Sequence, residues 1–423
     1  ELPLWQTIGH TITMNQARAQ AQAVRVVSNT WARDSHDLFD FEATDLHRKT
    51  FTALRQSIFV RSGTDVQMMS DPLLQLAPSC DPLLRLAQRD GAFWVDRANH
   101  SGNKKLWLVV RDMPGSVHHL NEGDVIKLGR FKFRVRQLVG AGNTQPELKL
   151  DESGTVCSVN PEGETELAQT LCRICLLEGP GEGDPLITPC QCKGSIEYVH
   201  LGCLRHWIRG RLNLSDSSGG SYFYRPLPCE LCKAVYPTYM QNHENPSETM
   251  PLVEVPWTQP PFIVLENMVR DSQQHACRGL HVISLAEKVL KLGRGHESDV
   301  RIADVSISRC HAMIRFQLGR FQLEDNNSKF GTLVAMKKPR LLEPGQGMSI
   351  QMGRTVLSLL AHADLEAIEA PTPLRRSLSN GAADERQLRL ALLGRGAGAR
   401  PDGWGTEQPG EAAQVQRETD ELF

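Results

Sequence analysis

The sequence contains no run of roughly 18 to 20 apolar residues, which is the length that a membrane-spanning helix needs. It begins with neither the basic segment nor the apolar core of a secretion signal. A surplus of one charge is also missing, because 47 Lys and Arg against 49 Asp and Glu leave a net charge of -2. No global basic field exists to hold a polyanion such as DNA. We therefore expect a soluble protein, cytoplasmic or nuclear, with no membrane span and no nucleic-acid partner.

The length of 423 residues allows several domains, and stretches without regular pattern divide the chain. Glycine, proline and acidic residues fill 141–168, and five prolines interrupt 241–261, so we expect two linkers. The segment 363–423 has only two aromatic residues and is expected to be disordered. The segment 1–45 gives no clear pattern, and a start at Glu1 leaves the natural N-terminus undefined.

The two flanking regions, 46–140 and 262–362, show related patterns. Residues from Gly123 to Val135 match those from Gly347 to Leu359 at a constant separation. Apolar and polar residues alternate, as in 314–318, where every second side chain is expected on one face of a half-buried strand. The patterns predict a duplicated, antiparallel β-sandwich unit, with chance similarity as the alternative.

Seven of the 11 cysteines cluster with one histidine in the segment 169–240. Without a secretion signal, such a cluster favours metal binding over disulfides. The residues form four closely spaced pairs, which suit the tetrahedral thiolate and imidazole sites of zinc. Eight ligands predict two zinc ions, and a segment this short needs them to fold. The predicted ligands are Cys172, Cys175, Cys190, Cys192, His200, Cys203, Cys229 and Cys232.

This segment resembles the RING-CH class of RING domains, which is found in ubiquitin ligases. The resemblance rests on the ligand order, on the Cys-Gln-Cys-Lys-Gly-Ser motif from Cys190, and on Trp207 on the helix after Cys203. It implies a cross-braced module. One zinc ion would be held by Cys172, Cys175, His200 and Cys203, and the other by Cys190, Cys192, Cys229 and Cys232.

The resemblance further implies a RING-type E3 ubiquitin transferase that has no catalytic residue and forms no covalent intermediate. Such a domain holds a ubiquitin-conjugating enzyme charged with ubiquitin, and it acts through proximity and orientation. The residues expected to bind the conjugating enzyme are Ile174 and Trp207, and Lys233 stands where the family's ubiquitin-orienting basic residue falls. For Trp207, packing inside the zinc module is the alternative.

A PHD finger, which reads histone tails, has the same ligand order and is the competing interpretation. In PHD fingers the second ligand pair is wider, and an aromatic residue stands two positions before the seventh ligand, where this chain has Leu227. RING-CH is preferred on these features. A non-catalytic adaptor with a PHD-like zinc finger remains the second hypothesis.

The segment 262–362 resembles a forkhead-associated (FHA) domain, a β-sandwich that binds phosphothreonine peptides. The resemblance rests on Leu-Gly-Arg ending at Arg294, on Ser-x-x-His from Ser308, and on Asn-Ser-Lys-Phe-Gly-Thr from Asn327. Phosphothreonine carries roughly -1.5 to -2 charge and three acceptor oxygens, so a guanidinium and a hydroxyl suit it. The residues expected to bind a phosphothreonine-containing partner are Arg294, Ser308, Arg309 and Lys329.

Two further positions of the FHA motif have expected roles. His311 resembles the family's buried, loop-bracing histidine. Phe330 stands where many members have an asparagine that contacts the peptide backbone, and phenylalanine can only pack there. We therefore expect an altered peptide affinity.

The earlier repeat lacks the phosphate-binding motif. Arg61 is placed like Arg294, but Pro82 stands where the Ser-x-x-His motif needs its histidine. We interpret 46–140 as a degenerate FHA-like domain without phosphate chemistry. The predicted fold is multidomain and mainly β: this domain, a cross-braced two-zinc RING-CH module, an FHA-like β-sandwich and a disordered C-terminal tail.

Overall fold

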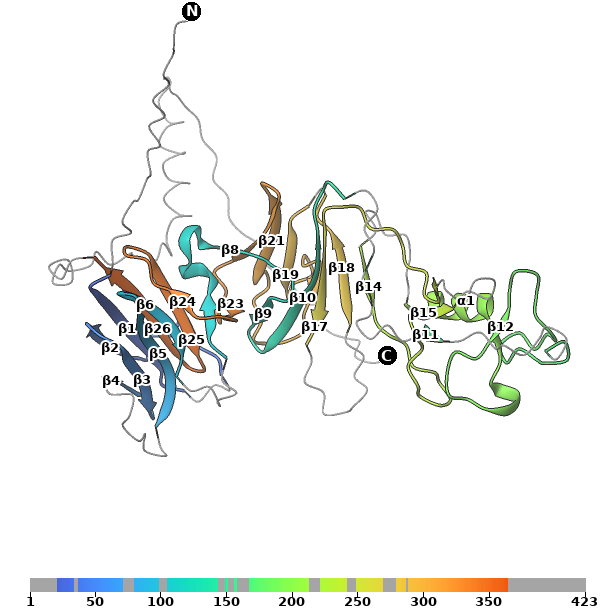
Figure 1. The fold of residues 1–423 in the computed structure, drawn as a ribbon, viewed down its shortest axis with the longest axis horizontal. Helices are drawn as coiled ribbons and strands as arrows, with labels where there is room; N and C mark the ends of the chain where they lie inside the picture. Colours follow the sequence, from blue (N-terminus) through green and yellow to red (C-terminus); the bar gives the residue numbers. More distant parts are fainter. Residues whose placement is uncertain are drawn as a thin grey trace, which may run out of the picture. The chain divides into compact units, whose positions relative to one another are not determined.

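The computed structural model describes residues 21–33, 37–70, 80–98, 105–143, 148, 150, 156–157, 167–212, 221–241, 249–268, 279–286 and 288–363 (Figure 1). Most of the predicted linker 141–168 and all but the first residue of the predicted disordered tail lie outside these residues. The described chain is mainly β, as predicted. Its helical elements are α1 (Leu201–Leu212) and the 3₁₀ turns η1 (Val110–Asp112), η2 (Pro114–Ser116) and η3 (Gly194–Ile196).

Most strands belong to three sheets. The largest has the order β14 (Tyr222–Tyr224), β18 (Leu280–Ser284), β17 (Phe262–Asn267), β10 (Phe131–Val139), β9 (Val125–Leu128), β23 (Thr332–Ala335), β7 (Trp107–Val109), β25 (Gly347–Met352), β26 (Thr355–His362), β1 (Ala23–Trp31) and β2 (Leu46–Ala53). A second sheet has the order β20 (Val300–Arg301), β19 (Leu290–Gly293), β21 (Ala312–Gln317), β22 (Arg320–Asp325) and β8 (Val117–His119). The third has the order β24 (Arg340–Leu341), β6 (Ala92–Arg97), β5 (Asp81–Arg89), β3 (Ser57–Ser62) and β4 (Asp65–Met69).

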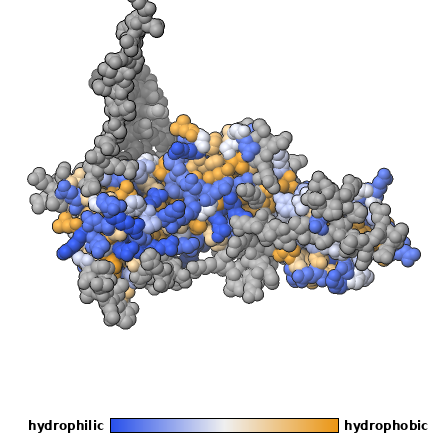
Figure 2. Space-filling view, viewed as in Figure 1, coloured by the Kyte–Doolittle hydropathy of each residue, from blue (hydrophilic) through white to orange (hydrophobic). Residues whose placement is uncertain are grey.

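Two hydrophobic cores divide these sheets into two sandwiches. The core of the first sandwich contains Phe59 and Leu84 together with Leu357, and that of the second contains Leu292 and Ile314 together with Phe133. Apolar side chains at alternate strand positions meet between the sheets, as the period of two predicts. On the face shown in Figure 2, hydrophilic residues predominate over the first sandwich.

The two repeats exchange their last strands. In the structure the first repeat also includes the described residues of the segment 1–45, because β1 pairs with β2. β10 of this first repeat pairs antiparallel with β17 of the second, and β26 of the second repeat pairs antiparallel with β1 of the first. In the same way β8 pairs with β22. β24 pairs with β6, beside which it lies in Figure 1. The first sandwich therefore consists of β1–β7 with β24–β26, and the second of β17–β23 with β8–β10. The contiguous units predicted from 46–140 and 262–362 differ from the structure in this respect.

The physical reason lies in the equivalence of the two exchanged hairpins. β7 and β23 pair antiparallel with each other, and after these strands each repeat continues into the opposite sandwich. The hairpin β9–β10 and the hairpin β25–β26 carry the matching motifs noted in the sequence, so each presents the same apolar pattern to a core. Residue pattern alone could not decide which sandwich receives which hairpin.

The zinc module is joined to the second sandwich through its own strands. Its short hairpin is β12 (Leu186–Ile187) with β13 (Val199–His200), and a small sheet joins β11 (Val156–Cys157), β15 (Tyr239–Gln241) and β16 (Thr249–Pro251). β14 follows α1 in the chain and pairs antiparallel with β18. The module's cluster of buried residues accordingly runs on to Phe262 and Val282.

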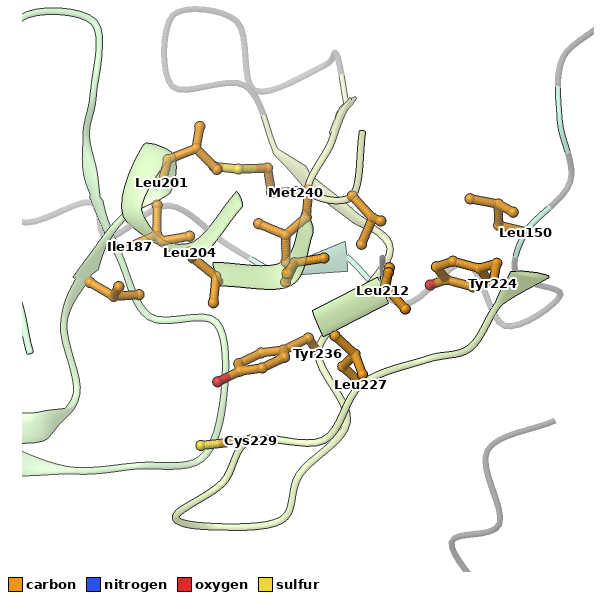
Figure 3. Packing of buried hydrophobic residues seen from close by; sticks show 14 of the residues in the cluster. Leu150, Ile187, Leu201, Leu204, Leu212, Tyr224, Leu227, Cys229, Tyr236 and Met240 are labelled. Carbon is orange, nitrogen blue, oxygen red and sulfur yellow. The ribbon is translucent and has the colours of Figure 1, made fainter. Parts of the chain in front are cut away.

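Helix α1 packs one apolar face into this cluster. Leu201, Leu204, Ile208 and Leu212 are its buried residues, at the spacing of a single helical face. Figure 3 shows Leu204 and Leu212 in one cluster with Tyr236. On the outer side, Arg205 and Arg209 both pair with Glu254, at 3.2 and 2.8 Å. Part of the stretch predicted as a proline-rich linker thus packs against the module.

Strand exchange predicts that one substitution in the first repeat weakens the second sandwich. Phe133→Ala removes a fully buried ring in β10, and we expect a loss of about 3 to 5 kcal/mol in the free energy of unfolding. Leu357→Ala, at the equivalent position of β26, should weaken the first sandwich instead. Hydrogen exchange would report each loss: β19 and β21 for Phe133→Ala, β3 and β5 for Leu357→Ala. The reverse assignment would contradict the exchange.

Candidate metal centres and phosphopeptide site

The eight predicted ligands gather into two clusters. One contains Cys172, Cys175, His200 and Cys203, and the other contains Cys190, Cys192, Cys229 and Cys232. Within each cluster the ligand atoms all lie within 4.8 Å of one another. The first and third pairs thus meet at one site and the second and fourth at the other, in the cross-braced arrangement that the RING-CH resemblance implies.

The spacing of the ligand atoms fits zinc. Sulfurs arranged as a tetrahedron about 2.3 Å from one ion are about 3.8 Å apart. The Sγ atoms of Cys192 and Cys229 are 3.8 Å apart, and Nδ1 of His200 is 3.2 Å from Sγ of Cys175 and 3.9 Å from Sγ of Cys203. Three thiolates with one imidazole, and four thiolates, are both donor sets of structural zinc. The chain therefore has two sites that fit zinc ions.

A hydrogen bond fixes which nitrogen of His200 faces the cluster. Nε2 donates to the carbonyl oxygen of Gly179 at 2.8 Å, which leaves Nδ1 as the metal-binding nitrogen. Gly179 has a φ of 70°, and a Cβ there would lie 3.1 Å from the carbonyl oxygen of Ala168. His206, by contrast, is exposed and belongs to neither cluster.

The electrostatics of the clusters favour a bound cation. Burial alone would raise the pKa of Cys172 and of Cys229, but backbone amide donors outweigh it and lower the two values to about 7 and about 6. Burial and neighbouring cysteines raise the pKa of Cys192 and of Cys203 to about 12. Several thiolates in contact repel one another, and a divalent ion among them removes that penalty.

Arg173, which the sequence analysis did not single out, connects the two clusters. It lies between Cys172 and Cys175 in the chain, yet its guanidinium donates to Sγ of Cys190 at 3.5 Å. It also donates to the carbonyl oxygen of Ile196 at 2.7 Å and to the hydroxyl of Tyr236 at 3.2 Å. No spacing rule signals such a residue, because its role depends on the cross-braced fold.

The residues predicted to bind the conjugating enzyme differ in exposure. Ile174 is 42% exposed, whereas Trp207 is half-buried and packs edge-on against Tyr236 with ring centroids 5.9 Å apart. Trp207 therefore contributes to packing, the alternative that the sequence left open, and keeps part of its surface outside. Lys233 is exposed, and its ammonium donates to the carbonyl oxygen of Glu230 at 2.7 Å. Leu231, at 59%, is a further exposed apolar residue between the last two ligands.

The predicted phosphopeptide residues converge at one end of the second sandwich. The backbone amide of Arg294 donates to the carbonyl oxygen of Ser308 at 3.1 Å, and that of Lys329 donates to Oγ of Ser308 at 3.2 Å. The carbonyl oxygen of Arg309 accepts from Gly295 at 2.9 Å. The side chains of Arg294, Arg309 and Lys329 are exposed. The loops that carry these three cationic residues thus meet around Ser308, an arrangement that suits a phosphate group.

Buried His311 braces these loops. The amide of Ser308 donates to its Nδ1 at 3.1 Å, and its Nε2 donates to the carbonyl oxygen of Gly331 at 3.2 Å. This pattern requires a neutral ring, and burial lowers the pKa of His311 accordingly. The bracing role implied by the FHA resemblance agrees with these contacts.

Phe330, the departure from the FHA pattern, packs against the first repeat. Its ring centroid lies 6.3 Å from that of Trp31, in a cluster that also holds Phe39 and Trp107. The neighbouring Lys329 pairs with Asp40 at 3.3 Å. A position that contacts peptide in many FHA domains is here used for contact between the repeats.

Arg61, the predicted counterpart of Arg294, is engaged internally. It pairs with Asp81 at 2.7 Å and donates to Oγ1 of Thr355 at 3.0 Å, and its side chain is only 15% exposed. Residues 71–79 and 99–104 lie outside the described residues. Within the described part, Arg61 is a structural residue, in keeping with the interpretation of a degenerate repeat.

Comparison with known families agrees with both resemblances. Residues 172–232 match the RING-variant domain, and residues 290–353 match the FHA domain. The zinc module is a RING-variant domain. The FHA match continues through β24 and β25, which belong to the first sandwich, because it follows the chain rather than the exchanged strands.

Relatives of the RING-variant domain are ubiquitin ligases by name. "E3 ubiquitin-protein ligase MARCHF8" from Homo sapiens is 42% identical over 106 residues, which are 25% of this chain and 31% of that protein. "E3 ubiquitin-protein ligase MARCHF7" from Pongo abelii is 38% identical over 72 residues, 17% of this chain and 10% of that protein. The chain thus spans less than a third of either relative. No helix within the described ranges is long and apolar enough to cross a membrane.

The cross-braced clusters predict a stepwise loss of metal. Wild type should carry two zinc ions per chain, and Cys190→Ser should lose the ion of one cluster because a thiolate ligand is missing. His206→Gln, on the exposed side of the same module, should keep both ions. Elemental analysis of the purified proteins measures the ratio. Full zinc content in Cys190→Ser would contradict the assignment.

Proposed function

We propose that the chain is a RING-type E3 ubiquitin-protein ligase that recruits phosphothreonine-containing partners. The observation that carries the proposal is the pair of cross-braced Cys and His clusters, with Ile174 exposed between the first two ligands. Exposed apolar side chains on a small rigid module are typical of a docking surface. The similarity to proteins named E3 ubiquitin-protein ligases supports the same activity.

The chemistry of the proposed reaction needs no acid or base from this chain. A substrate lysine amine attacks the thioester carbonyl of the charged conjugating enzyme, an isopeptide bond forms, and the cysteine thiol of that enzyme leaves. The zinc ions would hold the docking surface in shape. Ile174 and the exposed part of Trp207 would bind the conjugating enzyme, and Lys233 would contact the enzyme or its ubiquitin. The chain's contribution is orientation of two bound reactants.

The second sandwich would determine which partner protein the chain binds. Arg294 and Ser308 would bind the phosphate oxygens, while Arg309 and Lys329 add positive potential. Phe330 offers no amide to the peptide backbone, so affinity would depend more on the phosphate than in FHA domains with asparagine. A partner bound here is brought to the same chain as the charged conjugating enzyme, which raises its local concentration.

Ubiquitin transfer tests the ligase activity. Ile174→Ala should reduce autoubiquitination at least tenfold across a panel of purified conjugating enzymes, because the docking surface loses its exposed apolar side chain. Ile196→Ala is the matched control, since Ile196 is 43% exposed in the same module, and it should retain activity. If wild type with full zinc content transfers no ubiquitin with any enzyme of the panel, the non-catalytic adaptor is the better description.

Peptide binding tests the phosphate site separately. Arg294→Ala should weaken phosphothreonine peptide binding about 10- to 100-fold, the effect of losing a charge-assisted hydrogen bond. Arg301→Ala, an exposed arginine in β20 of the same sandwich, should bind like wild type. Fluorescence anisotropy with a phosphothreonine library and its unphosphorylated counterpart measures both. Equal binding by wild type and Arg294→Ala would remove the phosphate assignment.

A further inference from the structure

The loop that carries Lys329 is organised by one buried carboxylate. The side chain of Asp325 is 0% exposed. Its Oδ1 accepts hydrogen bonds from the hydroxyl of Ser328 at 2.5 Å, and from the amide and the hydroxyl of Thr332 at 2.9 and 2.7 Å. Asp325 therefore fixes both ends of the loop Ser328–Thr332, and with them the position of Lys329.

The charge of Asp325 is balanced by a residue from the first repeat. A guanidinium nitrogen of Arg111, in η1, lies 2.7 Å from Oδ2 of Asp325 and also donates to the carbonyl oxygen of Ser328 at 2.5 Å. An ionised carboxylate without solvent needs such a partner, because an unpaired buried charge is strongly destabilising. Arg111 and Asp325 are 214 positions apart in the sequence.

A second residue of the first repeat encloses the same loop. The ring of Phe41 lies under the guanidinium of Arg111, 4.4 Å from centroid to Cζ, and the amide of Phe41 donates to the carbonyl oxygen of Lys329 at 3.0 Å. Gly331 has a φ of 73°, and a Cβ there would come within 2.5 Å of the Phe41 ring. Glycine at position 331 thus allows the loop to pass this close to the ring.

We propose that Arg111 and Phe41 are positioning residues for phosphopeptide binding, so that the phosphopeptide site of the second sandwich is a composite of both repeats. The inference rests on the proposed phosphothreonine binding. Arg111 and Phe41 hold the loop Ser328–Thr332 in the conformation in which the amide of Lys329 donates to Oγ of Ser308. The first repeat, which lacks a phosphate motif of its own, contributes the brace that shapes the neighbouring site.

The chemistry predicts graded effects at position 111. Arg111→Gln leaves Asp325 without a cation, and we expect phosphothreonine peptides to bind about tenfold more weakly. Arg111→Lys restores the charge but not the planar fork that reaches both Asp325 and Ser328, so its affinity should be intermediate. Phe41→Leu keeps an apolar side chain and removes the ring, and it should weaken binding in the same direction.

The experiment uses the full chain and combines two measurements. Anisotropy with the phosphothreonine library measures affinity, and hydrogen exchange measures protection of the Ser328 and Thr332 amides relative to β21. We expect Arg111→Gln and Phe41→Leu to lose loop protection while β21 stays protected. Arg315→Gln is the matched control, because Arg315 forms an ion pair with Glu324 in the same sandwich, at 3.2 Å, and not with Asp325.

The outcomes separate this inference from the function on which it rests. If wild type binds no phosphothreonine peptide, the proposed phosphoprotein function fails, and the loop protection of Arg111→Gln then decides the bracing role by itself. Wild-type affinity together with wild-type loop protection in Arg111→Gln and Phe41→Leu overturns the inference. If Arg111→Gln does not fold, Phe41→Leu decides by the same two measurements.

Discussion

The antiparallel pairing of β7 with β23 is the constraint on which the two sandwiches depend. At this point each repeat leaves its own sandwich, and the strands that follow complete the other one. Neither repeat can therefore bury its apolar residues without the other. The core that contains Phe133 and the core that contains Leu357 are each built from residues of both repeats. The arrangement explains why the first repeat, which lacks the Ser-x-x-His motif, is still required: it supplies three strands to the sandwich that contains Arg294 and Ser308, and it receives three in return.

The zinc module solves the folding problem in a different way. Its helix contributes one apolar face to the buried cluster, and ligand bonds at two sites join segments that are distant in the sequence. Polar contacts around the ligands then orient the ligand side chains and connect the two clusters. Gly179 orients His200, and Arg173 ties the segment of one cluster to the sulfurs of the other. A small module built in this way can leave Ile174 and Leu231 exposed, because its fold does not depend on burying them.

The sequence predicted the zinc ligands and the FHA motif better than the path of the chain. Zinc ligands and the FHA motif lie within short segments, so spacing and residue type are enough to find them. Arg111 was not found, because its partner Asp325 is distant in the sequence and only strand exchange brings them together. The exchange itself was hidden because the two hairpins carry the same pattern of glycine and apolar residues. Leu318 shows a local failure: alternation predicts it on the face of Ile314, but it is 97% exposed with a φ of 50° where the hairpin turns.

The position of β14 connects zinc binding with the exposure of one edge of the largest sheet. This strand lies in the chain between ligands Cys203 and Cys229, and it covers the outer backbone of β18. At the opposite end of the sheet, the exposed side chains of Arg48 and Lys49 lie on the edge strand β2. Such charges disfavour the pairing of an edge strand with another molecule. The β18 end is instead covered by the short strand β14, which the chain places between zinc-ligand segments. If loss of zinc unfolds these segments, β14 would leave a row of unpaired amides and carbonyls on β18, and self-association through that edge would follow.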